Sequence, residues 1–96
     1  MEVVLSDKAR ADLIRIHSYL EERSPNAADA FIRRIDGSFE NLLRFPFIGR
    51  ERLRFAPGIR CLVAGVHLIF YTVGADRITI VRVIDGRMDV DEEFLR

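Results

Sequence analysis

The sequence predicts an α+β domain in which an N-terminal strand, an antiparallel two-helix hairpin and a three-stranded antiparallel meander build one small sheet. Three observations lead to this fold class. Two stretches with helical apolar spacing occupy the first half of the chain, and three β-branched stretches separated by glycine-containing turns occupy the second half. The length of 96 residues suits one hydrophobic core, so we expect a single domain over residues 1–96.

The first strand and the first helix are predicted within the first quarter of the chain. Met1–Leu5 indicates a strand because β-branched valines occupy its centre. Ser6 is a favourable helix N-cap, and Asp7 places an acid in the first turn, where the helix dipole favours negative charge. The helix should end near Arg23. Its apolar stripe consists of Ala9, Leu13, Ile16 and Leu20.

A second helix is predicted between Ser24 and Pro46. Ser24 can cap it, Pro25 suits the first helical position, and Pro46 biases the residue before it away from the α conformation. We expect the two helices to form an antiparallel hairpin that covers one face of the sheet. The wide apolar face of the second helix consists of Ala28, Phe31, Ile32, Ile35, Phe39, Leu42 and Leu43.

Three strands are predicted after a loop over Phe47–Gly58, and both connections between them resemble hairpins. The strands are Ile59–Ala64, Val66–Val73 and Arg77–Asp85. The last one is apolar on both faces, which is typical of a central strand covered on each side. Its alternation places Ile78, Ile80 and Ile84 on one face with Arg82, and Thr79, Val81 and Val83 on the other. The acidic tail after Gly86 fits either a short helix or an irregular segment.

Composition and charge exclude several classes of protein. The net charge is zero, whereas a protein that binds the nucleic acid backbone is usually basic, so we expect no direct sequence-specific nucleic acid binding. A single cysteine, Cys61, forbids an internal disulfide and favours the cytoplasm. The longest apolar run is too short for a bilayer and the N-terminus does not resemble a signal peptide, so we expect no membrane association. Cys61, His17 and His67 lack a metal-ligand spacing, and we expect no metal and no cofactor.

Short motifs follow one another along nearly the whole chain. They are Ser6-x-x-Ala9-x-x-Asp12-Leu13, Arg23-Ser24-Pro25, Phe45-Pro46, Ile48-Gly49-Arg50, Gly58-Ile59-Arg60, Ile69-Phe70-Tyr71 and Val81-Arg82-Val83-Ile84-Asp85-Gly86-Arg87. In this order and spacing the chain resembles the RelE/ParE toxin superfamily, and within it the ParE group. At Asp85 the sequence departs from the superfamily, in which a histidine is common before the last Gly-Arg.

The resemblance allows a nuclease function to be examined position by position. The RNA-cleaving members of the superfamily use basic side chains on the middle strands and an Arg and a Tyr near the C-terminus. The matching positions in this chain are Leu68, Met88 and Phe94, whose side chains can neither move a proton nor stabilise charge. We therefore expect that the chain is not an enzyme and has no catalytic residues.

The resemblance to ParE implies a toxin of a type II toxin–antitoxin system that inhibits DNA gyrase and blocks replication. It also implies a cognate ParD-like antitoxin, whose C-terminal segment would fold over the sheet face that the helices leave bare. The alternative is a RelE-like ribosome-dependent mRNA endoribonuclease with a rearranged set of Arg60, His67 and Arg82. A further possibility is a non-toxic member that only binds its antitoxin.

Arg82 is the residue that bears most on where a partner would bind. An unpaired guanidinium in an otherwise apolar central strand is costly. The sequence leaves two interpretations open: an internal ion pair, with Asp85 or an acid of the tail, or a pair with a carboxylate of the partner. The candidate antitoxin-binding residues are Arg60, Arg82, Asp85, Arg87, Phe94 and Leu95.

The aromatic residues and the arginine-rich loop have ordinary structural interpretations. Arg50, Arg52 and Arg54 alternate along the loop, a pattern more typical of a solvated loop than of a binding patch. The aromatic residues are spaced mostly as core residues rather than as a platform for stacking bases. They are Phe31, Phe39, Phe45, Phe47, Phe55, Phe70 and Tyr71.

Overall fold

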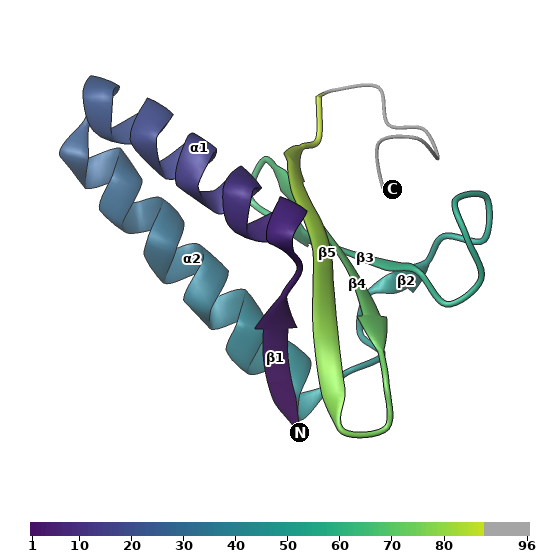
Figure 1. Cartoon of the computed structure of the whole chain (residues 1–96). Helices are drawn as coiled ribbons and strands as arrows, with labels where there is room; N and C mark the ends of the chain where they lie inside the picture. Colours follow the sequence, from purple (N-terminus) through teal and green to yellow (C-terminus); the bar gives the residue numbers. More distant parts are fainter. Residues whose placement is uncertain (88–96) are drawn as a thin grey trace.

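The computed structural model describes residues 1–87, in which a helix hairpin lies on one face of a single mixed sheet (Figure 1). The elements are β1 (Glu2–Leu5), α1 (Asp7–Arg23), α2 (Pro25–Arg44), β2 (Arg50–Glu51), β3 (Arg60–Ala64), β4 (His67–Val73) and β5 (Arg77–Asp85). The strand order is β1-β5-β4-β3-β2, with β1 parallel to β5 and the other pairs antiparallel. This confirms the predicted α+β class, but the predicted four-stranded sheet has a fifth, two-residue strand inside the expected loop.

The two helices are joined with almost no linker because one serine serves both of them. The Ser24 amide donates to Leu20 O at 2.7 Å and so ends α1. The Ser24 Oγ accepts from the Ala27 amide at 3.2 Å and caps α2, with Pro25 at its first position. The connection therefore turns within one residue, and the hairpin predicted from Arg23-Ser24-Pro25 is confirmed.

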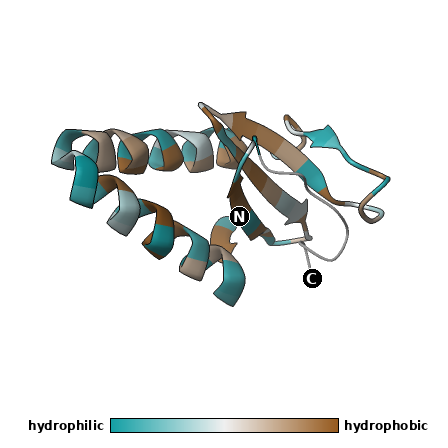
Figure 2. Cartoon of the chain, turned by 90° about the horizontal axis from the view of Figure 1, so that it is seen from above, coloured by the Kyte–Doolittle hydropathy of each residue, from teal (hydrophilic) through white to brown (hydrophobic). Residues whose placement is uncertain are grey.

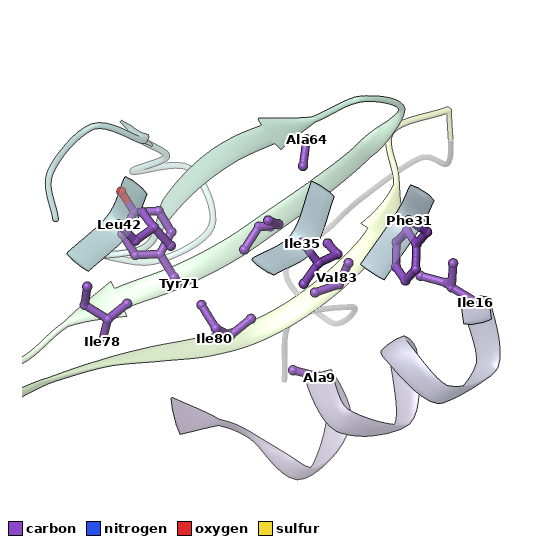
Figure 3. Packing of buried hydrophobic residues seen from close by; sticks show 11 residues of the cluster. Ala9, Ile16, Phe31, Ile35, Leu42, Ala64, Tyr71, Ile78, Ile80 and Val83 are labelled. Atoms are coloured by element: carbon purple, nitrogen blue, oxygen red, sulfur yellow. The ribbon is translucent and has the colours of Figure 1, made fainter. Parts of the chain in front are cut away.

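The main core lies between the hairpin and the sheet. Figure 2 shows hydrophobic residues along the strands and hydrophobic segments alternating with hydrophilic ones along both helices. Fully buried side chains such as Phe31 and Leu42 from α2 meet Ile69 and Tyr71 from β4, and Figure 3 shows the helix and strand side chains converging. Each such side chain contributes roughly 1.5–3 kcal/mol by leaving water. This layer holds the hairpin in place and so fixes the position of α1 at the sheet edge.

A β-bulge in β5 changes which residues face the helices. Register shifts between Phe70 and Tyr71, whose partners are Arg82 and Ile80, so the bulge skips Val81. Beyond the bulge Val83 joins the helix-side core, while Val81 and Ile84 pack in the cluster on the opposite face. The predicted grouping of Ile84 with Ile78 and Ile80, and of Val83 with Thr79, is therefore wrong, because strict alternation assumes a regular strand.

The face of the sheet away from the helices is covered in part by the chain's own loop. Phe55 and Ile59, from the segment between β2 and β3, pack on Phe70 with Cys61 and Ile84. The expectation of a bare face is thus wrong for this part of the sheet. Other positions stay open, since Val63 in β3 has 66% of its surface exposed.

Two of the aromatic residues predicted as core are on the surface. Phe31, Phe55, Phe70 and Tyr71 are buried, as expected, and Phe39 is partly buried. Phe45 and Phe47 are exposed, because α2 ends before them and they lie in the turn that leads to β2. Within residues 1–87, neither helix is both long enough and apolar enough to cross a bilayer.

Candidate functional site

The first turns of α1 take the place of a strand along the outer edge of β5. Strand β1 pairs with β5 only as far as Leu5 and Ile80. Beyond that point, the Ser6 Oγ donates to Val81 O at 2.8 Å and the Val83 amide donates to Asp12 Oδ2 at 3.0 Å. The side chains of Asp12 and of Ser6, the N-cap of α1, thus satisfy backbone groups of β5 that a neighbouring strand would otherwise bind.

Asp12 also neutralises Arg82 of β5. The Arg82 guanidinium donates to both carboxylate oxygens of Asp12, with Nε to Oδ2 at 2.7 Å and Nη2 to Oδ1 at 2.8 Å. The Arg15 Nη2 donates to Oδ1 at 2.8 Å from the solvent side. Burial alone would raise the pKa of Asp12, but the hydrogen bonds from Arg82, the Val83 amide and Arg15 outweigh it and lower the pKa. The same pair raises the pKa of Arg82.

The ion pair decides between the two interpretations of Arg82 in favour of an internal partner. That partner is Asp12 of α1, which was not among the expected acids. Asp85 pairs with Arg87 instead, and the acids of the tail lie outside the described residues. The signal in the sequence was the position of Asp12 on the buried stripe of α1, between Ala9 and Ile16 at helical spacing. An acid on a buried stripe needs a cation, and Arg82 is the cation in the interior of the last strand, whereas Arg77 begins it.

A cavity of about 590 Å³ opens next to this ion pair, between α1 and the ends of β4 and β5. Its walls are largely apolar, with a few charged side chains between the apolar ones. Tyr19 is 54% exposed and Val66 is 55% exposed, so large apolar groups face solvent at the cavity. The lining residues are Arg15, Ile16, Tyr19, Leu20, Val66, His67, Arg82, Ile84, Asp85 and Arg87. A pocket of this size and character suits apolar side chains with flanking acids.

Asp85 and Arg87 form a second ion pair in the cavity wall. The Arg87 Nη2 and Nε donate to Asp85 Oδ2 and Oδ1 at 2.6 and 3.0 Å, and the Arg87 amide donates to Oδ1 at 2.8 Å. These bonds hold the pKa of Asp85 well below its usual range and raise that of Arg87. The Arg87 side chain is 80% exposed, so its charge is presented to solvent and to anything that enters the cavity.

His67 lines the cavity and is buried, and its environment favours the neutral form of its ring. Its ring packs edge-on against Phe31 with centroids 4.9 Å apart. Burial lowers its pKa, Asp85 opposes this effect, and Arg34 and Arg87 add to it. Its Nδ1 has no hydrogen-bond partner among residues 1–87. A ring that is almost fully buried is poorly accessible to a substrate, and its lowered pKa makes it a weaker base, which does not favour the rearranged nuclease set.

Of the six candidate antitoxin-binding residues, the four that the structure describes do not all lie together. Arg82, Asp85 and Arg87 come together at the cavity. Arg60 lies toward the other edge of the sheet, where its Nη1 donates to Phe47 O at 3.2 Å and to Gly49 O at 2.8 Å. Phe94 and Leu95 lie outside the described residues. The sequence missed Tyr19 and Val66, which carry no pattern that separates them from ordinary surface residues.

Of the three positions that match the catalytic residues of the nucleases, only Leu68 lies in the part of the chain that the structure describes. Leu68 lies in β4 and packs, partly buried, against the cluster around Phe55 and Phe70. Met88 and Phe94 lie outside the described residues. Among residues 1–87, no group of three His, Cys, Asp or Glu side chains is arranged to hold a metal ion.

A small mixed sheet, a helix hairpin on one face and an apolar cavity rimmed by arginine define a compact partner-binding protein. The family described as "ParE toxin of type II toxin-antitoxin system, parDE" matches residues 3–90. The chain belongs to this family. It is 37% identical over 93 residues to Toxin ParE1 of Mycobacterium tuberculosis, with 95% of each chain covered. It is 29% identical over 89 residues to Toxin ParE3 of Caulobacter vibrioides, covering 92% of this chain and 89% of the relative.

Solved structures of toxin–antitoxin systems share the fold. The chromosomal ParDE system from P. aeruginosa matches with a TM-score of 0.72 and 25% identity, covering 88% of this chain and 95% of that one. The toxin–antitoxin complex RelBE2 from Mycobacterium tuberculosis matches with a TM-score of 0.65 and 22% identity over the same shares, which bears on the fold alone. Both likenesses agree with the predicted α+β arrangement.

Proposed function

We propose that this toxin acts in the cytoplasm by inhibiting DNA gyrase, which blocks replication, and that a cognate ParD-like antitoxin neutralises it. Membership of the ParE toxin family supports the proposal, as does the likeness to the ParDE system from P. aeruginosa. The single structural observation that carries the antitoxin part is the apolar cavity between α1 and the ends of β4 and β5, with arginines in its wall.

The cavity suits an amphipathic acidic segment of the antitoxin. Apolar side chains of such a segment would bury the exposed faces of Tyr19 and Val66, and its carboxylates would pair with Arg15 and Arg87. Phe94 and Leu95 stay predicted contacts of the antitoxin. Arg82 is held by Asp12, so its contribution is to shape the cavity wall.

The antitoxin part is tested by changing Tyr19 to Ser and measuring the affinity of the purified toxin for its antitoxin by calorimetry. We expect about a tenfold weaker affinity, since a partly buried aromatic anchor contributes more than about 1 kcal/mol. The matched control is Ile14→Ser, because Ile14 is also on α1, is 62% exposed and does not line the cavity. Equal affinities of the two variants would count against the cavity as the binding site.

The gyrase part is tested with antitoxin-free toxin, purified gyrase and relaxed plasmid DNA. We expect the toxin to block supercoiling or to trap cleaved DNA, and the antitoxin to restore the reaction. The proposed mechanism is binding rather than catalysis, which the apolar Leu68 and the burial of His67 support. Unchanged supercoiling, together with specific cuts in translated mRNA seen by primer extension, would favour a RelE-like nuclease instead.

A further inference from the structure

An exposed apolar turn between α2 and β2 takes no part in the cavity. Phe45, Phe47 and Ile48 expose 61%, 65% and 53% of their surfaces. Single exposed apolar side chains are ordinary, but three within four residues form a local concentration of the kind that marks a contact surface. We call residues 45–48 the aromatic turn. It leads into β2, the edge strand at the opposite end of the sheet order from β1.

The backbone of the aromatic turn is held in one conformation. The Ile48 amide donates to Phe45 O at 3.1 Å, with Pro46 at the second position of the four-residue turn. Arg60 reaches over from β3 and donates to Phe47 O, and its guanidinium lies 5.0 Å from the centroid of the Phe47 ring. The exposed rings are therefore presented by a fixed backbone, so that ordering them costs little when a partner binds.

A buried tyrosine fixes the end of the same turn. The Gly49 amide donates to the Tyr71 Oη at 2.8 Å, and the phenol is fully buried. No larger residue fits at Gly49, because a Cβ there would lie 2.6 Å from Tyr71 Oη and 2.9 Å from Cys61 O. The core thus anchors the segment that carries Phe47 and Ile48.

The charged residues in the segment that contains the aromatic turn are mostly arginines. Residues 44–60 contain five arginines, one glutamate and no lysine. Arg44 and Arg50 flank the turn and are exposed, and Arg60 lies against it. Exposed aromatic rings with arginine and without lysine are the composition enriched at the energetic centres of protein–protein interfaces. The surface is complementary to one that carries acids around apolar side chains.

Two other occupants fit these observations less well. A second copy of the chain would set the same arginines against one another in a symmetric contact, and like charges repel. A nucleic acid would stack its bases on aromatic rings, but aliphatic Ile48 offers no such stacking and the chain has no net charge. The remaining occupant is a protein surface.

We propose that the aromatic turn is the surface with which this toxin docks on an acidic, partly apolar patch of its protein target, separately from the antitoxin cavity. The inference rests on the proposed function only in that the toxin acts by binding a protein. It assigns the two partners to different parts of the molecule: the antitoxin to the end where α1 meets β5, and the target to the β2 edge.

The experiment uses the toxin with the double substitution Phe45→Ser and Ile48→Ser. These two side chains are chosen because neither takes part in the contacts with Arg60 and Tyr71 that hold the turn. A second variant, Arg50→Glu, reverses one flanking charge, and Ile14→Ser is the control for an equally exposed apolar residue elsewhere. Each is measured for growth arrest on induction, inhibition of purified gyrase, affinity for the antitoxin and urea midpoint. We expect both turn variants to lose growth arrest and to inhibit about tenfold less well, with antitoxin affinity and urea midpoint unchanged.

Three results would overturn the docking surface. Turn variants that arrest growth like the parent would show that the turn is not needed. A loss of antitoxin affinity in the turn variants would assign the turn to the antitoxin. Altered binding of a single-stranded oligonucleotide would assign it to nucleic acid. If the parent arrests growth without affecting gyrase, the proposed target is wrong. The aromatic turn is then tested only by comparing growth arrest between the parent and the turn variants.

Discussion

Asp12 lies on the buried stripe of α1 and accepts hydrogen bonds from Arg82, Arg15 and the Val83 amide. We expect Asp12→Asn to destabilise the protein by about 3–5 kcal/mol, because it removes the carboxylate that neutralises a mostly buried arginine. The control Arg15→Gln should cost less than about 1 kcal/mol, since the Arg15 side chain is 61% exposed. Urea unfolding measures both, and similar losses in the two variants would contradict this account.

His67 makes stability depend on pH. Its pKa is lowered in the folded protein by burial, so in the range below the ordinary histidine value the unfolded chain binds more protons. The contribution of His67 is therefore fully present above about pH 6.5 and is lost as the pH falls toward the folded pKa. We expect His67→Leu to flatten the loss of unfolding free energy between about pH 7 and pH 5, measured by urea titration at each pH. An unchanged slope would mean that another group titrates.

Ser6 acts at the level of whole elements, because it joins the start of α1 to the edge of β5. Its Oγ accepts from the Ala9 amide at 3.0 Å as a helix cap and donates to Val81 O at 2.8 Å. We expect Ser6→Ala to cost about 2–3 kcal/mol, the sum of a lost cap and an orphaned carbonyl. Ser24→Ala, which removes only the side-chain cap of α2, should cost about 1 kcal/mol. Thermal unfolding of both variants tests whether the difference is present.

The elements that the sequence predicted well are those whose signals are local. Both helices end where caps and proline indicate, and β5 occupies the predicted Arg77–Asp85. The bulge at Val81 was missed because it depends on pairing with β4, which no local pattern contains. The two-residue β2 was missed for the same reason, since its partner is β3.

At the scale of the whole molecule, the sequence predicted the candidate site only in part. It placed Arg82, Asp85 and Arg87 together because they lie within six residues on one strand and its end. It grouped Arg60 with them by charge, although the sheet order separates β2 and β3 from the outer edge of β5. The contribution of α1 to the cavity depends on how the hairpin docks, which is a property of the tertiary structure.

The central position of the last strand predicts that the chain does not fold without it. Strand β5 lies between β1 and β4, and its Ile78, Ile80 and Val83 belong to the main core. We expect a chain that stops at Asp76 to show no cooperative urea transition, while the full chain shows one, because the truncation removes the partner of two strands and of α1. A sigmoidal transition in the shortened chain, followed by far-UV circular dichroism, would contradict this expectation.

Asp12 and Arg82 are 70 residues apart in the chain, so their ion pair also limits how early the domain can fold during synthesis. Once both helices and strands β3 and β4 have been synthesised, the nascent chain still lacks β5, the strand that lies between β1 and β4 in the sheet. Only after the segment around Val83 has left the exit tunnel can the N-terminal strand and helix settle against it. Folding of the domain therefore cannot be complete until Arg77–Asp85 has been synthesised.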